Sequence, residues 1–100
     1  MDDSLHADLY KLLSRIQSDK EVKRLLIDLL SPAEIDNIAE RWHIMQEIAA
    51  GTSHRAIAKA VGTSIAKVSR CARVVWHGNG AIQECLERDN KFGTSKKKMR

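Results

Sequence analysis

Proline, glycine and aromatic residues are scarce in this chain: its 100 residues include one proline, five glycines and four aromatic residues. Proline and glycine interrupt helices, so their scarcity favours an all-α fold. No apolar run approaches the roughly 20 residues that a helix needs to span a bilayer. The N-terminus, MDDSLHADL, is acidic and lacks the basic start and apolar core of a signal peptide. We therefore expect a cytoplasmic protein with no membrane partner.

The sequence also lacks the common signatures of catalysis and metal binding. Its histidines and cysteines show no CxxC or HxxxH spacing, and there is no glycine-rich phosphate loop or nucleophile motif. Two cysteines, Cys71 and Cys85, are too few for a disulfide framework and are expected as reduced thiols. These absences predict a protein that is not an enzyme and holds no metal and no resident cofactor.

Acidic residues are missing from one long segment, 51–78, which has no Asp or Glu but contains Arg55, Lys59, Lys67, Arg70 and Arg73. A second basic zone is the C-terminal tail, 91–100, with five basic residues and no acid. The formal net charge is +4, so residues 1–90 alone sum to −1. Two basic zones on a near-neutral body are the electrostatic footprint of a nucleic-acid-binding protein. We expect the tail to be disordered; a solvated end without a role is the alternative.

Apolar spacing and capping residues predict six helices in one domain, 1–90. The predicted helices are 4–17, 20–30, 32–50, 54–61, 64–76 and 81–89. Ser18, Ser31 and Ser53 are expected to cap the helices that follow them, and Glu34 completes a capping box with Ser31. Gly51 is expected to end the third helix.

The segment His54–Arg73, HRAIAKAVGTSIAKVSRCAR, has the spacing of a DNA-binding helix-turn-helix. Ala58 must be small where the second helix crosses, and Gly62, four residues later, reverses the chain at positive φ. We expect Thr63 to cap the second helix. The positions expected to be buried between the two helices are Ile57, Val61, Ile65, Val68 and Cys71. An ordinary helical hairpin with a solvated basic face is the alternative interpretation.

The first three predicted helices carry more apolar surface than a small monomer readily covers. Leucines repeat on one side of the first two, and the third is apolar on more than one face. We therefore expect a homodimer; a compact monomeric bundle is the alternative.

The helix order and three sequence pieces resemble the tryptophan repressor (Trp repressor) family. The pieces are Leu30-Ser31-Pro32-x-Glu34, Arg41 in the long helix, and Ser64-Ile65-Ala66-x-Val68-Ser69-Arg70. The loop before the fourth helix and the segment Arg73…Gly78-Asn79 look more like the YerC/YecD-like branch of that family. The resemblance implies a six-helix, all-α Trp-repressor-like fold, an intertwined homodimer whose first three helices and last helix form the shared core. The helix-turn-helix, 54–76, is then the part that reads double-stranded DNA.

The resemblance also implies roles for individual DNA-binding residues. Arg55 matches an arginine that reads guanine, and Ile65, Ala66 and Ser69 match the exposed start of the recognition helix. Arg73 and Lys67 are candidates for phosphate contacts. The full set of candidate DNA-binding residues is His54, Arg55, Ser64, Ile65, Ala66, Lys67, Ser69, Arg70 and Arg73.

A corepressor pocket for L-tryptophan is also implied, with Arg41 and Arg70 flanking the ligand and Ser31 near its amino group. This chain departs from the family pattern at Cys71, where the family has glycine, and at Val74, where it has a polar residue. Lys67 replaces a short hydroxyl residue. We therefore expect L-tryptophan to bind weakly or not at all. In the alternative interpretation Arg70 contacts a DNA phosphate and Arg41 pairs with Glu40 or Glu47.

The sequence as a whole predicts a homodimeric, sequence-specific transcriptional regulator, a repressor, that binds a palindromic DNA operator. One alternative is the DNA-binding module of a transposase-like protein, because such modules share this helix-turn-helix. Another is a protein-interaction adaptor whose basic face meets an acidic partner.

Overall fold

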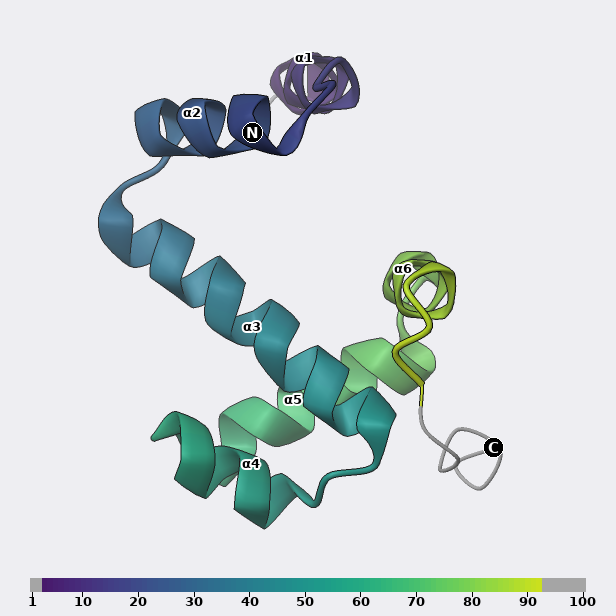
Figure 1. Cartoon of the computed structure of the whole chain (residues 1–100). Coiled ribbons are helices and arrows are strands. Elements are labelled where there is room, and N and C mark those ends of the chain that lie inside the picture. The colour runs from purple at the N-terminus through teal and green to yellow at the C-terminus, as the bar shows by residue number, and fades with distance from the viewer. Residues whose placement is uncertain (1–2, 93–100) are drawn as a thin grey trace. The chain divides into compact units, whose positions relative to one another are not determined.

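The computed structural model describes residues 3–92, and every regular element in that range is a helix (Figure 1). The six helices are α1 (Asp3–Ser14), α2 (Asp19–Leu29), α3 (Pro32–Ala50), α4 (His54–Val61), α5 (Ile65–His77) and α6 (Ala81–Arg88). The predicted all-α fold with six helices is confirmed. Among the described helices, none is long and apolar enough to cross a membrane.

The chain divides into two compact units, Met1–Asp36 and Asn37–Arg100. The described part of the N-terminal unit contains α1, α2 and the first turn of α3, and neither α1 nor α2 has a buried residue. Large apolar side chains are instead exposed along both helices: Leu5, Leu9, Tyr10, Leu12, Leu13, Ile27 and Leu29.

Helix α1 ends three residues earlier than predicted, at Ser14 rather than at residue 17. The hydroxyl of Ser14 donates a hydrogen bond to the carbonyl of Lys11 at 2.8 Å, and the next two backbone amides bond three residues back instead of four. A side chain that bonds its own backbone competes with helix continuation. This local competition explains the early end of α1.

Serine caps begin α2 and α3 as the sequence predicts. The hydroxyl of Ser18 accepts from the backbone amide of Glu21 at 3.2 Å. Ser31 and Glu34 form a reciprocal capping box, in which each backbone amide donates to the other's side chain, at 3.2 and 2.8 Å. The hydrogen bond that the Ser31 backbone amide donates to the Glu34 carboxylate is the main cause of the lowered pKa of this carboxyl, and the Ser31 side chain adds to the effect.

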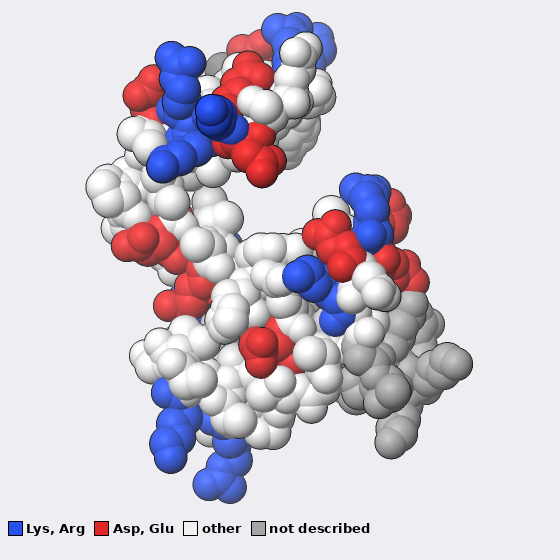
Figure 2. Space-filling view, viewed as in Figure 1, with Lys and Arg blue, Asp and Glu red and all other residues white. Residues whose placement is uncertain are grey.

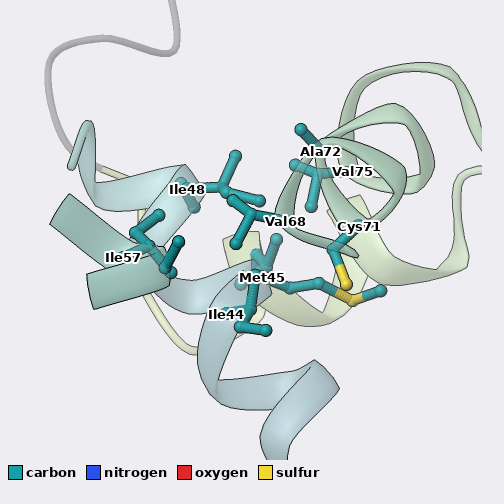
Figure 3. Packing of buried hydrophobic residues seen from close by; sticks show 11 residues of the cluster. Ile44, Met45, Ile48, Ile57, Val68, Cys71, Ala72 and Val75 are labelled. Carbon is teal, nitrogen blue, oxygen red and sulfur yellow. The ribbon is translucent and has the colours of Figure 1, made fainter. Parts of the chain in front are cut away.

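The C-terminal unit is built on a core shared by α3, α4, α5 and α6 (Figure 3). Its largest side chains that are less than 2 % exposed are Ile44, Ile57, Val68, Val75 and Leu86. Ile44 comes from α3, and Ile57 and Val68 from the two helices of the predicted helix-turn-helix. The helix-turn-helix therefore rests on the C-terminal half of α3.

Glycines with positive φ make the turns that the sequence predicts at the ends of α3 and α4: φ is 96° at Gly51 and 79° at Gly62. The predicted cap of α5 is wrong by one residue. The hydroxyl that caps α5 belongs to Ser64, not Thr63, and accepts from the backbone amide of Lys67 at 3.1 Å. An N-cap side chain must directly precede the first helical residue, and α5 begins at Ile65.

The predicted C-terminal tail begins on the surface of this unit. The backbone amide of Lys91 donates to the carbonyl of Leu86 at 2.8 Å, and the Phe92 ring packs on Trp76 with centroids 5.7 Å apart. The rest of the predicted tail, 93–100, lies outside the described residues.

Candidate nucleic-acid interface

Helices α4 and α5 and the turn between them have helix-turn-helix geometry. Gly62, in the left-handed conformation, ends α4, and its amide bonds the carbonyl of Ala58 at 2.9 Å. The amide of Thr63 bonds the same carbonyl at 3.0 Å. Ala58 is only 7 % exposed, so a larger side chain there would collide with its surroundings. The small residue and the glycine act as the spacing predicts.

The outer face of this helix-turn-helix carries basic and small side chains. Its exposed residues include seven of the nine candidate DNA-binding residues: Arg55, Ser64, Ile65, Ala66, Ser69, Arg70 and Arg73. The other two, His54 and Lys67, are half-buried. Figure 2 shows Lys and Arg side chains projecting from the edge of this unit where α4 lies, with uncharged surface beside them. The interface is therefore positive and sterically open.

Ile65 shows where the predicted core was wrong. The sequence places it between the two helices, but its side chain is 50 % exposed, and the partner position Val61 is only half-buried. Of the five predicted core positions, Ile57, Val68 and Cys71 are buried. Ile65 is the first residue of α5, at the end of the turn that joins the two helices. The exposure of Ile65 agrees instead with the family resemblance, in which Ile65 matches the exposed start of the recognition helix.

Two candidate residues, His54 and Ser69, meet across the motif. Nδ1 of His54, the first residue of α4, lies 3.4 Å from the Oγ of Ser69 on α5. These residues are 15 apart in sequence, and no local pattern predicts their contact. The start of α4, where Arg55 lies, is thereby linked to the recognition helix.

Lys67, predicted to contact phosphate, has protein partners in the structure. Its ammonium forms an ion pair with Glu40 of α3 and donates to the Oδ1 of Asn37 at 3.1 Å. Sequence reasoning missed both contacts, which span 27 and 30 residues. The only signal in the sequence for the ion pair is the opposite charge of Lys67 and Glu40.

A hollow of about 200 Å³ lies beside this ion pair, between α3 and α5. Its lining residues are Arg41, Met45, Lys67, Arg70, Cys71 and Val74. Four of the five residues of the implied corepressor pocket thus come together. The fifth, Ser31, belongs to the N-terminal unit, where its hydroxyl caps α3.

Cys71 lines this hollow and is buried, 5 % exposed. Burial raises the pKa of its thiol, and the opposing effect of Lys67, Arg41 and Arg70 is smaller. The thiol is therefore neutral near pH 7 and packs as a small apolar group. In the described chain both cysteines are free, and no group of three or more His, Cys, Asp or Glu could hold a metal ion.

The carboxylates suggested as partners of Arg41 have other contacts. Glu40 pairs with Lys67, and the Oε1 of Glu47 accepts from the hydroxyl of Thr52 at 2.9 Å. Arg41 itself is an exposed residue that lines the hollow. Its guanidinium remains available to a ligand or to another surface.

Comparison with known proteins identifies the family. The family model described as Trp repressor protein matches residues 4–90. The chain belongs to the Trp repressor family. It is 28 % identical over 80 residues to the uncharacterized protein YerC of Bacillus subtilis (strain 168), covering 80 % of this chain and 77 % of that protein. This likeness supports the YerC-like branch.

A solved structure shares the fold of this Trp repressor family member. It is the crystal structure of a proposed Trp repressor from Staphylococcus aureus, which superposes with a TM-score of 0.82 at 24 % identity. The match covers 94 % of this chain and 93 % of that one. The Trp-repressor-like fold is confirmed. The Trp repressor family is a family of regulators rather than of enzymes, and its members bind DNA.

Proposed function

We propose that this protein is a sequence-specific transcriptional repressor that binds a palindromic DNA operator as a homodimer. The observation that carries the proposal is the outer face of α4 and α5: a helix-turn-helix whose segment, 51–78, contains no acidic residue and exposes three arginines, Arg55, Arg70 and Arg73. Duplex DNA attracts such a face through its phosphates, and a protruding helix fits the major groove.

The exposed residues divide into those suited to bases and those suited to the backbone. Arg55, in the first turn of α4, can present two donors to guanine O6 and N7. Ile65 and Ala66 open α5 with a small apolar surface that can meet a thymine methyl group. Arg70 and Arg73 lie further along α5 and are assigned to phosphates, which set the register on the duplex.

The homodimer is supported by apolar surface that the described chain leaves uncovered. Tyr10 of α1 and Ile27 of α2 are 64 % and 58 % exposed, and neither helix buries a residue. Ile38 of α3 is 50 % exposed and lines a second, mostly apolar hollow with Trp42 and Ile82. Surface of this kind is covered in stable proteins by a partner. If the partner is a second copy, the two-fold symmetry of the dimer calls for a palindromic operator.

L-Tryptophan is proposed to act weakly or not at all as a corepressor. Arg41 and Arg70 supply the two cations that the family resemblance implies, but Cys71 and Val74 line the same hollow. A side chain in place of glycine takes up space, and valine offers no hydrogen bond to an amino group.

Selection of binding sites from a random pool of duplexes tests the proposal. The full chain, with and without L-tryptophan, should enrich one palindromic site equally well. Arg55→Ala should lose the preference at one base pair of this site, whereas Arg88→Ala, which changes an exposed arginine on α6, serves as the matched control. No enrichment over a random duplex would favour the adaptor, and an enriched site without two-fold symmetry would favour a transposase-like module.

A further inference from the structure

The first turn of the recognition helix is held differently from the rest of α5. The buried residues of α5 are Val68, Cys71, Ala72 and Val75, so the first three residues of the helix, 65–67, include none. Ile65 and Ala66 are exposed, so apolar packing anchors the start of α5 only through Val68, the residue that follows Lys67. A further contact between the start of α5 and another helix is polar and runs through Lys67.

Lys67 ties this turn to α3 through two groups that lie three residues apart on one face of that helix. Its ammonium pairs with the carboxylate of Glu40 and donates to the amide oxygen of Asn37 at 3.1 Å. The two charged side chains are 26 % and 32 % exposed, so the pair is partly shielded from water. Partly buried ion pairs are screened by salt less than exposed ones.

The charges around the neighbouring hollow make this carboxylate important. Three cations line the hollow, Arg41, Lys67 and Arg70, and its lining contains no acid. Such a cluster favours an anion, and Glu40 supplies one from within the chain by pairing with Lys67. The carboxylate of Glu40 therefore supplies the negative charge that joins α3 to α5, and a bound anion is not needed for this link.

We infer that Lys67 is a positioning residue: paired with Glu40 and Asn37, it holds the first turn of α5 in its DNA-binding orientation without a small-molecule ligand. This inference rests on the proposed function and adds to it how the recognition helix α5 is held in position. The competing role for Lys67 is a direct phosphate contact, which would leave Glu40 without a part in binding. The two roles predict opposite effects of changes at Glu40.

Neutralising Glu40 separates the two roles. Glu40→Gln makes the protein more positive, so a purely electrostatic view predicts unchanged or tighter DNA binding. The positioning role predicts the reverse, a loss of operator affinity of about tenfold, equivalent to about 1.4 kcal/mol. Glu84→Gln on α6 makes the same charge change at an exposed site and is the matched control. Equal affinities of Glu40→Gln and Glu84→Gln would overturn the inference.

A charge exchange provides the second test. Glu40→Lys and Lys67→Glu should each weaken operator binding about tenfold or more, and the double variant should recover most of that loss because the pair is rebuilt with its charges exchanged. If Lys67 contacts phosphate directly, the double variant should bind as poorly as Lys67→Glu alone. That result would overturn the positioning role.

Hydrogen exchange on the free protein makes the inference independent of DNA binding. The amide of Val68, bonded to the carbonyl of Ser64 at 3.3 Å, should lose protection in Glu40→Gln and regain it in the charge-exchanged double variant. Failure of the wild-type chain to select any DNA site would refute the proposed function, whereas unchanged protection in Glu40→Gln would refute the positioning role. Circular dichroism confirms that each variant is folded.

Discussion

The Oγ of Ser69 on α5 lies 3.4 Å from Nδ1 of His54 at the start of α4. This contact links the two helices at the outer face of the helix-turn-helix, where both residues are candidates for DNA binding. It also sets the backbone beside Arg55 relative to the recognition helix. In the proposed complex with DNA, the positions of Arg55 and of α5 on the duplex should therefore be coupled.

Arg55 and Arg73 should differ in how their loss affects DNA binding. Arg55→Ala should relax the preference at one base pair by about 1–3 kcal/mol, because a bidentate contact to guanine is lost. Arg73→Ala should weaken binding to all duplexes alike and lower the salt slope by about one unit, because one phosphate contact is lost. Titrations of the selected site and its single-base variants at several salt concentrations measure both. A changed sequence preference in Arg73→Ala with none in Arg55→Ala would reverse the assignments.

The uncovered apolar surface of α1 and α2 should make the protein an obligate homodimer. In the operator complex the two recognition helices should lie about 34 Å apart, one turn of DNA. Sedimentation at micromolar concentration should show only a dimer. Leu9→Lys places a charge on the exposed apolar stripe of α1 and should dissociate and unfold the protein, because a buried unpaired charge is costly. Asp8→Lys, exposed on the same helix, is the control. A folded wild-type monomer would rule out the dimer.

L-Tryptophan should bind the wild-type chain weakly or not at all. Cys71 adds a side chain to the hollow, and overpacking typically costs about 1–3 kcal/mol. Val74 leaves the ligand's amino group without a partner, which costs a similar roughly 1–3 kcal/mol. The double variant Cys71→Gly with Val74→Ser should therefore bind tryptophan more tightly in calorimetry, and Val74→Ile provides a control that adds no polar group. A low-micromolar dissociation constant for the unaltered protein would show that the hollow repacks around Cys71.

The capping box at the start of α3 should make stability depend on pH through Glu34. Hydrogen bonds from Ser31 hold the pKa of this carboxyl below its ordinary value of 4.5. A lowered pKa in the folded state stabilises the fold at pH above the ordinary value, and this contribution is lost as pH falls through the folded-state pKa. Glu34→Gln removes the charge and with it this dependence.

Urea unfolding at one protein concentration measures this effect. The wild-type chain should be more stable than Glu34→Gln at about pH 6, and the difference should shrink towards about pH 3. Asp36→Asn, exposed in the same helix, makes the same charge change outside the capping box. A difference between wild type and Glu34→Gln that stays constant with pH would show that the carboxylate form has no special role.

Much of the fold was predictable because its signals are local. Ser31 and Glu34 cap α3 across three residues, and Gly62 ends α4 with a backbone conformation that only glycine adopts freely. The same local rules fail where they compete. Thr63 and Ser64 both offer a hydroxyl after the turn, and the one that caps is set by where α5 begins.

The candidate site was predictable as a set of residues but not as an arrangement. Sequence position and family resemblance together named Arg41, Arg70, Cys71 and Val74, and the structure brings them into one hollow. Neither could show that Lys67 turns towards Glu40, 27 residues away, or that His54 meets Ser69. Within a helix, side-chain partners lie three or four residues apart, and each backbone hydrogen bond joins residues four apart. Sequence alone therefore determines these contacts. Contacts between helices depend on how α3, α4 and α5 pack around Ile44, Ile57 and Val68, and only the tertiary structure decides that.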